Sequence, residues 1–371
     1  LSRDGRPQVY DSGNYEKVLN DAVDLSGYVE WRMRQQEYRK QGRYIGIGVA
    51  TAIENTGFGS FEGATVRIEA NGEVTVLTSA ATQGQGHETT LAQVAAEVLD
   101  VPLEKVTVLE GDTSLISYGT GTFASRIAVI AGTAVYRAAL GVKEKALQIA
   151  AAKLDANVER LVMKDESVFV ADQPEKRINL AEIAREAKGL SPGTTFPYSV
   201  QPGLEVSDYF APEAASITSM TDIAVVEVNP DTGAIKILDY TSIHDSGKLL
   251  NPLIVKGQVQ GGIANGLGNA LYEEIVYDRQ GQLLTSTLMD YLVPSACEVP
   301  EMKIAHVETP SPLNPLGVKG AGESGTIPVP AVIQSAVEDA LREWGIKLET
   351  IPVKPSHLVE LLRQGREVSV P

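Results

Sequence analysis

The chain has 371 residues, of which 43% are hydrophobic and 22% charged, a composition typical of a folded protein with a sizeable core. Its net charge of −16, from 48 acidic and 32 basic residues, argues against nucleic acid or an anionic membrane as a partner. The single cysteine, Cys297, excludes an internal disulfide and any metal site built on several thiolates of this chain. One cysteine also fits a reducing cytoplasm.

The first half of the sequence predicts a hairpin followed by a helix. A polar lead-in segment, residues 1–40, has a helical pattern over residues 15–39. Alternating apolar and polar residues then predict a β-hairpin over residues 66–76, and Asn71-Gly72 predicts a type I′ turn between its strands. The returning strand leads into the loop TSAATQGQGHETT, residues 78–90, and an amphipathic helix follows it.

The second half repeats this plan. A hairpin over residues 223–238 surrounds NPDTG, its second strand leads into a loop, and a glycine-rich helix is expected over residues 255–274. A long alanine-rich helix is expected to end near residue 153, and a short helix is expected over residues 180–187. A further helix is expected over residues 331–344, with Gly345 as its stop signal. The sequence therefore predicts an α+β fold of two similarly built subdomains of mixed sheets with helices. We expect a division into residues 1–40, 41–200 and 201–371.

The stretch GVKGAGESG, residues 317–325, contains a GxGxxG string at Gly320, Gly322 and Gly325. A dinucleotide-binding turn needs a strand that enters the glycines and a helix that starts within them. Prolines before the string forbid a regular strand, and prolines after it delay the helix to about residue 330. A carboxylate at Glu323 would also repel phosphate, so the nucleotide-binding interpretation fails here.

Four loops share one composition, with glycine beside Gln, Thr, Ser or Glu near a strand end or a helix start. They are Gln83 to His87, Thr120 to Arg126, Gln258 to Gly262 and Lys319 to Gly325. Successive backbone N–H groups in such turns bind anions, and Gln amides both donate and accept hydrogen bonds. The loops suit a large, phosphate-bearing cofactor that is held without cationic side chains.

Four stretches in this order resemble the C-terminal half of the molybdenum-binding large subunit of the xanthine oxidase family. They are TQGQGHETTLAQVAAEVL, GTFASRIAVIAGTAVYRAA, NPLIVKGQVQGGIANGLGNALYEE and GVKGAGESG, and together they span most of residues 40–345. The family includes aldehyde oxidoreductases, nicotinate dehydrogenase and aerobic carbon monoxide dehydrogenase, whose large chain is similar to this one.

The resemblance assigns roles to individual residues. It implies that Glu323 is the catalytic base, and the glycines around it suggest a poorly solvated carboxylate suited to accept a proton. It implies contact with the molybdopterin cofactor for Gly84, Gln85, Gly86, Phe123, Ala124, Ser125, Gln258 and Gly322. The molybdenum is then held by the cofactor and by no metal-ligating side chain of this chain.

Simpler interpretations stay open for these residues. Glu323 can be a solvated loop carboxylate, and Gln85 and Gln258 can cap their loops. We expect His87 to be a structural histidine with its hydrogen bonds satisfied, although it could line the site. Lys319 could pair with Glu323 or a cofactor phosphate, or lie at the surface.

The resemblance implies a molybdenum hydroxylase or dehydrogenase that oxidises an aldehyde, an N-heteroaromatic, an acyl-CoA or CO with water-derived oxygen. The cofactor would be molybdopterin, as the cytosine dinucleotide, with 2Fe-2S clusters and FAD on partner subunits. This chain would be a fragment or a split subunit, so the N-terminal half of the molybdenum subunit is a further expected partner. The alternative is a non-catalytic scaffold or maturation partner that keeps the cofactor-binding fold.

Overall fold

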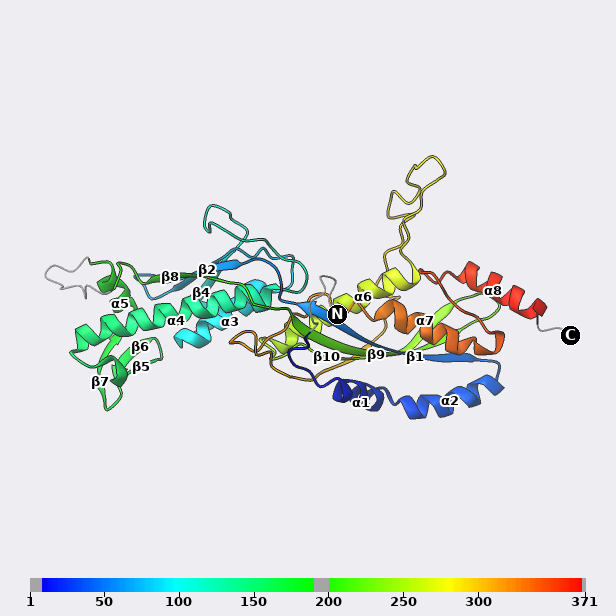
Figure 1. Ribbon diagram of the computed structural model, residues 1–371, viewed down its shortest axis with the longest axis horizontal. Coiled ribbons are helices and arrows are strands. Elements are labelled where there is room, and N and C mark those ends of the chain that lie inside the picture. The colour runs from blue at the N-terminus through cyan, green and yellow to red at the C-terminus, as the bar shows by residue number, and fades with distance from the viewer. Residues whose placement is uncertain (1–8, 190–199, 369–371) are drawn as a thin grey trace. The chain divides into compact units, whose positions relative to one another are not determined.

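The computed structural model describes residues 9–189 and 200–368. The chain divides into two compact units. Unit 1 comprises Leu1–Asn55, Ile217–Pro310 and Ala321–Pro371, and unit 2 comprises Thr56–Ser216 and Ser311–Gly320. Both combine sheets with helices, so the predicted α+β class is confirmed (Figure 1). No helix in the two described ranges is long and apolar enough to cross a membrane.

Unit 1 is built on a four-stranded sheet with the order β1-β9-β10-β11, in which β9 and β10 are antiparallel and β10 and β11 are parallel. Its strands are β1 (Tyr44–Thr56), β9 (Ser216–Val228), β10 (Ile235–Asp245) and β11 (Met302–His306). Its helices are α1 (Tyr15–Ser26), α2 (Tyr28–Lys40), α6 (Pro252–Leu271), α7 (Val329–Ala340) and α8 (Pro355–Val368).

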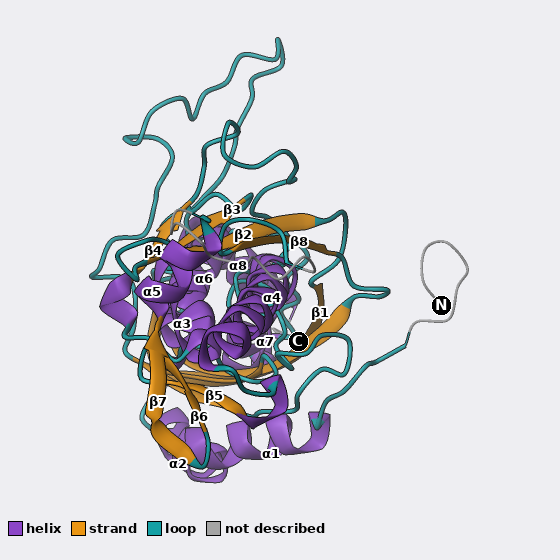
Figure 2. Cartoon of the chain, turned by 90° about the vertical axis from the view of Figure 1, so that its left-hand side faces the viewer, coloured by secondary structure: helices purple, strands orange, loops and turns teal. Residues whose placement is uncertain are grey.

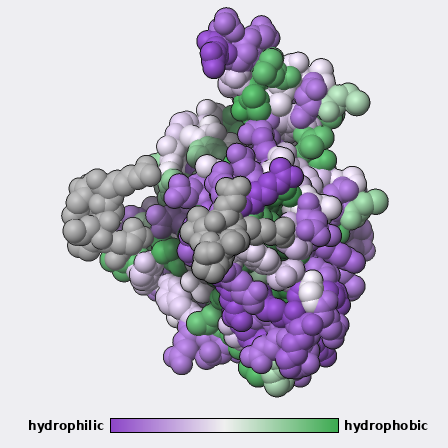
Figure 3. Space-filling model, turned by 90° about the vertical axis from the view of Figure 1, so that its right-hand side faces the viewer, coloured by the Kyte–Doolittle hydropathy of each residue, from purple (hydrophilic) through white to green (hydrophobic). Residues whose placement is uncertain are grey.

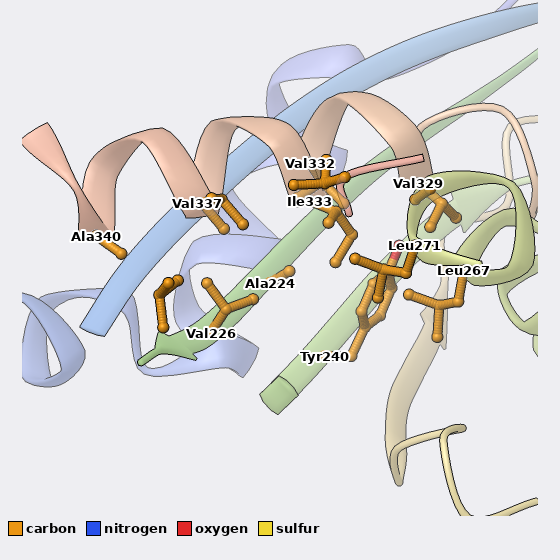
Figure 4. Packing of buried hydrophobic residues seen from close by; sticks show 14 of the residues in the cluster. Ala224, Val226, Tyr240, Leu267, Leu271, Val329, Val332, Ile333, Val337 and Ala340 are labelled. Atoms are coloured by element: carbon orange, nitrogen blue, oxygen red, sulfur yellow. The ribbon is translucent and has the colours of Figure 1, made fainter. Parts of the chain in front are cut away.

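Both faces of this sheet are covered, which explains why β9 is buried along nearly its whole length. On one face, Ala224, Val226 and Tyr240 pack against α6 and α7 (Figure 4). On the other face, the neighbouring strand residues Ile223 and Val225 pack against α1. Because side chains of a strand point alternately to the two faces of the sheet, successive residues of β9 lie in two separate cores.

Unit 2 has a four-stranded sheet with the order β4-β3-β2-β8 and a small sheet with the order β5-β6-β7. Its strands are β2 (Glu62–Ile68), β3 (Val74–Thr78), β4 (Val106–Leu109), β5 (Leu161–Lys164), β6 (Ser167–Val170), β7 (Gln173–Asn179) and β8 (Glu205–Phe210). Its helices are α3 (His87–Leu99), α4 (Ile127–Leu154) and α5 (Leu180–Ala187). Helix α4 packs on β2 and β8 and is accompanied by α3 (Figure 2).

The predicted repetition of one plan is confirmed. In unit 2 an antiparallel hairpin, β2-β3, leads through α3 to β4, which is parallel to β3. In unit 1 the hairpin β9-β10 leads through α6 to β11, which is parallel to β10. Each helix therefore follows a loop at the end of the second hairpin strand. The loop before α3 carries the motif Gln83 to His87, whereas Gln258 to Gly262, expected in a loop, lies within α6.

Three local predictions differ from the structure. The expected helix over residues 15–39 is broken at Gly27, whose φ of 66° is left-handed. The hairpin turn is not type I′, because only Gly72 has a positive φ, of 91°, and Glu69 N–H donates to Glu73 O across a longer loop. The helix expected over residues 331–344, α7, ends at Ala340, and a 3₁₀ turn carries the chain to Gly345.

A chain of buried polar groups crosses the face of the unit 1 sheet that α6 and α7 cover. Tyr240 Oη donates to Asp222 Oδ2 over 2.6 Å, and Ser242 Oγ donates to Asp222 Oδ1 over 2.5 Å. Ser242 Oγ also lies 2.6 Å from His244 Nε2. Burial raises the pKa of Asp222 to about 7 despite the two hydrogen bonds that favour its ionised form.

Replacing Asp222 by asparagine is expected to change how stability depends on pH. The pKa of Asp222 is about 7 in the folded protein and 3.8 in the unfolded chain. The protonated side chain therefore contributes its full stabilisation below pH 3.8, and this stabilisation is lost as the pH rises through about 7. The free energy of unfolding of the wild type, relative to Asp222→Asn, should fall by up to about 1.4 kcal/mol per pH unit in this window. Urea titrations at several pH values measure this difference, and parallel profiles for the two proteins would contradict it.

Candidate functional site

The loop between β3 and α3 carries the first predicted cofactor motif and lies in unit 2. Gly84 and Gly86 have φ values of 97° and 76°, which residues other than glycine rarely adopt. Gly86 precedes α3 without a side-chain cap, so the first N–H groups of the helix remain available to an anion. A Cβ added to Gly84 meets no atom within 4 Å, so the space over the loop is open.

The loop before α4 carries the second motif and touches the first, because Gln83 Nε2 donates to Thr122 O over 3.3 Å. Ala124 and Ser125 have φ values of 51° and 48°. Two successive non-glycine residues in this region are strained, and such strain is concentrated at functional sites. Phe123 is 50% exposed and its ring lies 4.9 Å from the Arg126 guanidinium carbon.

A buried ion pair, which no sequence motif indicates, fixes this second loop. Both side chains, Glu62 at the start of β2 and Arg126, are fully buried. Glu62 accepts from Thr120 N–H over 3.1 Å, from Gly121 N–H over 3.0 Å and from Arg126. Burial raises the pKa of Glu62, but hydrogen bonds from Ser79, Arg126 and Thr120 outweigh burial and lower it. A lone glutamate in a strand gives no sequence signal of such a partner.

Two polar side chains of the first loop, His87 and Gln85, differ in how well the simplest interpretation describes them. His87 is buried, and its Nδ1 has no hydrogen-bond partner within the described part of the chain, so the expected satisfied histidine is wrong. Burial lowers the pKa of His87 to about 4, and Nδ1 lies 3.8 Å from Glu110 Oε2. Gln85 Oε1 accepts from Gln83 N–H, so this side chain caps its own loop, as the simpler interpretation expects.

The other two motifs meet in unit 1. A Cβ on Gly325 would lie 2.5 Å from Val259 O, and one on Gly262 would lie 2.9 Å from Gly325 Cα. Thr326 Oγ1 donates to Gly262 O over 2.9 Å. The loop that carries Gly322 and Glu323 is therefore pressed onto the part of α6 that carries Gln258. Gln258 is half-buried, and Gly322 and Glu323 are exposed in this chain, so the expected poorly solvated carboxylate is not found here.

Alanine substitutions at two adjacent glycines of α6, Gly261 and Gly262, test the contact between α6 and Gly325. Gly262→Ala is expected to destabilise the protein by about 1–3 kcal/mol, because the new methyl group overlaps backbone atoms of Gly325. Gly261→Ala is the control, since its Cβ meets nothing within 4 Å and alanine raises helix propensity by up to about 1 kcal/mol. Urea denaturation of both variants measures the difference, and equal stability would contradict the contact.

The segment before Glu323 belongs to unit 2 and packs on the second loop. Gly320 has no room for a side chain, because its Cβ would lie 1.8 Å from Ser125 O. Gly320 N–H also donates to Thr56 Oγ1 over 3.0 Å. Lys319 is only 2% exposed, so the interpretation as a surface lysine is wrong. Lysine is rarely buried, and neither periodicity nor motif predicted it here.

In unit 2, the two connected loops, the helix starts without side-chain caps and the left-handed residues fit an anionic ligand with a large polar body. This geometry is that of a protein whose loops suit a phosphate-bearing cofactor. A family model described as the molybdopterin cofactor-binding domain matches residues 21–300. The chain belongs to this family, and the resemblance to molybdenum subunits of the xanthine oxidase family is confirmed.

Known proteins are similar over nearly the whole chain. The large subunit of nicotine 6-hydroxylase from Paenarthrobacter nicotinovorans is 36% identical over 95% of this chain and 44% of its own length. The carbon monoxide dehydrogenase large chain from Hydrogenophaga pseudoflava is 35% identical over 91% of this chain and 43% of its own. The crystal structure of quinoline 2-oxidoreductase from Pseudomonas putida 86 matches with a TM-score of 0.90 and 40% identity, over 96% of this chain and 47% of that one. The chain spans less than half the length of these relatives.

Proposed function

We propose that this chain is the molybdopterin-binding C-terminal part, or a split subunit, of a cytoplasmic molybdenum hydroxylase or dehydrogenase. The observation that carries the proposal is the pair of connected loops in unit 2, whose helix starts lack side-chain caps, in a chain of this family. Gly84, Gln85 and Gly86 of the first loop and Phe123, Ala124 and Ser125 of the second bind the cofactor. Gln258 and Gly322 are the further cofactor-binding residues of the proposal.

Glu323 is the catalytic base in this proposal. It is an exposed carboxylate in a loop whose backbone is held on α6 through Gly325 and Thr326. The bound cofactor supplies the redox centre, and the side chain accepts a proton from the water-derived group.

The cofactor form and the partners are part of the same proposal. The molybdopterin is the cytosine dinucleotide, and 2Fe-2S and FAD subunits complete an electron path. The remaining half of the molybdenum subunit is needed because this chain corresponds to 43–47% of its relatives. The enzyme is therefore a hetero-oligomer.

The substrate is a small molecule oxidised with oxygen from water: an aldehyde, an N-heteroaromatic, an acyl-CoA or CO. The names of two relatives, nicotine 6-hydroxylase and quinoline 2-oxidoreductase, support N-heteroaromatic rings as the class to assay first. The name of a third, carbon monoxide dehydrogenase, supports CO as the second.

Analysis of the nucleotide released from the enzyme tests the proposal. Acid treatment of the enzyme purified with its partner chains should release a pterin and cytidine monophosphate in equal amounts. Release of a pterin without the nucleotide would overturn the dinucleotide form alone. Release of neither compound from a correctly assembled complex would favour the scaffold alternative.

A further inference from the structure

An arm of unit 1 exposes hydrophobic side chains that no residue described by the structure covers. The arm is defined as residues 273–301, which join α6 to β11 and contain one isolated bridge, between Tyr277 and Leu283. It projects from the unit in Figure 1 and carries hydrophobic atoms behind a hydrophilic tip in Figure 3. Its large exposed hydrophobic residues are Ile275, Tyr277, Leu284, Leu288, Met289, Leu292 and Val293. Met289 is 86% exposed and Leu288 is 79% exposed.

The arm has an ordered shape in spite of this exposure. Leu284 N–H donates to Val276 O over 2.8 Å, which closes a hairpin. Thr287 Oγ1 donates to Asp290 Oδ2 over 2.9 Å and closes the turn that presents Leu288 and Met289. Local hydrogen bonds therefore preorganise the apolar residues, which lowers the entropic cost of binding a partner.

The arm is attached to the helix that carries Gln258. Tyr291 Oη donates to Glu273 Oε2 over 2.6 Å at the base of the arm. A Cβ on Gly268 of α6 would lie 2.1 Å from Glu273 Oε1 and 3.1 Å from Pro294 Cδ, so the base packs closely on α6. A protein surface that binds the arm would thus also hold α6.

The chemistry of the arm selects an apolar occupant. Between Leu284 and Val293 the sequence has one charged side chain, Asp290, and Thr287 already donates to its carboxylate. A cluster of exposed hydrophobic residues such as those of the arm is typical of an interaction surface. The solved quinoline 2-oxidoreductase matches 96% of this chain. The arm contains more residues than the part of the chain that this match leaves out. Part of the arm therefore has a counterpart there, in a subunit of which more than half lies outside the match.

We propose that the arm docks on an apolar surface of the part of the molybdenum subunit that lies outside this chain. This rests on the proposed function, which requires that part to exist. Docking buries Leu288 and Met289 and, through Glu273 and Pro294, holds α6 in the assembled enzyme. The arm is then the contact that joins the two parts of the molybdenum subunit.

Oxidation of methionine by hydrogen peroxide tests the docking, because its rate follows exposure. In the purified enzyme, Met289 should oxidise roughly tenfold more slowly than in the same enzyme unfolded in urea. Met33 on α2, which is 61% exposed, is the internal control and should oxidise at a similar rate in both. If the rate at Met289 is also the same in both, the proposal is overturned.

A cross-link from Cys297 identifies the occupant. Cys297 is exposed and lies on the arm, and it is the single cysteine of the chain. A cysteine-to-lysine cross-linker should capture a peptide from the rest of the molybdenum subunit. Capture of a second copy of this chain, or of an iron-sulfur or FAD subunit, would overturn the choice of occupant. An enzyme that contains no further part of a molybdenum subunit would instead refute the proposed function.

A pair of arm variants separates docking from folding. Leu288→Asp should abolish the protection of Met289 and raise its oxidation rate roughly tenfold, because a carboxylate is poorly accommodated in an apolar contact. Gln280→Asp, in the polar hairpin turn of the same arm, should leave Met289 protected. Unchanged protection in Leu288→Asp would contradict the docked arm.

Discussion

Glu323→Gln is expected to lower kcat of the assembled enzyme by on the order of 10²–10⁴-fold, the usual contribution of a positioned general base. Glutamine has nearly the same shape as glutamate but cannot accept the proton. The exposed position of Glu323 in the loop held by Gly325 and Thr326 predicts little loss of stability. Molybdenum content, measured on the same preparation, should therefore equal that of the wild type.

An exposed glutamate elsewhere in unit 1 controls for the loss of charge. Glu349→Gln removes one negative charge at a position outside the glycine-rich loops and should leave kcat unchanged. Wild-type turnover in Glu323→Gln would show that Glu323 is not the catalytic base. Loss of both turnover and molybdenum would instead assign Glu323 to cofactor retention.

Glu62→Gln is expected to be the most destabilising of the changes considered. It leaves the buried Arg126 guanidinium without a counter-ion and weakens the hydrogen bonds that hold Thr120 and Gly121. Breaking a buried ion pair in this way costs about 3–5 kcal/mol. Since Ala124 and Ser125 keep strained backbones only while their surroundings hold them, cofactor content should fall together with stability.

A surface pair in the same unit supplies the control. Arg160 and Asp172 form an ion pair with side chains 51% and 62% exposed. Asp172→Asn should therefore cost at most about 1 kcal/mol and leave the cofactor bound. Equal effects of Glu62→Gln and Asp172→Asn on thermal unfolding would contradict the assigned role of the buried pair.

The repeated plan of hairpin, loop and helix could be predicted because its signals are local. Alternating residues predicted β2 and β3, and apolar spacing predicted α3, although α3 starts at His87, inside the expected loop. The glycine-rich helix expected over residues 255–274 is α6, which starts and ends three residues earlier. The hairpin turn was predicted wrongly because Asn71-Gly72 is compatible with several loop lengths, and the pairing of Glu69 with Glu73 selects among them.

The glycine-rich motifs were visible in the sequence, whereas the contacts that fix them were not. Glu62 and Arg126 are far apart in the chain and meet only when β2 and α4 pack together. Lys319 is buried by the same long-range packing that brings Gly320 onto Ser125. Local composition carries no information about such partners, so the sequence shows the motifs but not the residues that support them.

The molybdenum content of the enzyme purified with its partner chains tests the central claim most directly. If the glycine-rich loops of this chain hold the cofactor, metal analysis should find about one molybdenum atom per copy of the chain. A complex that assembles correctly, with its iron-sulfur and FAD subunits, and contains no molybdenum would contradict the claim.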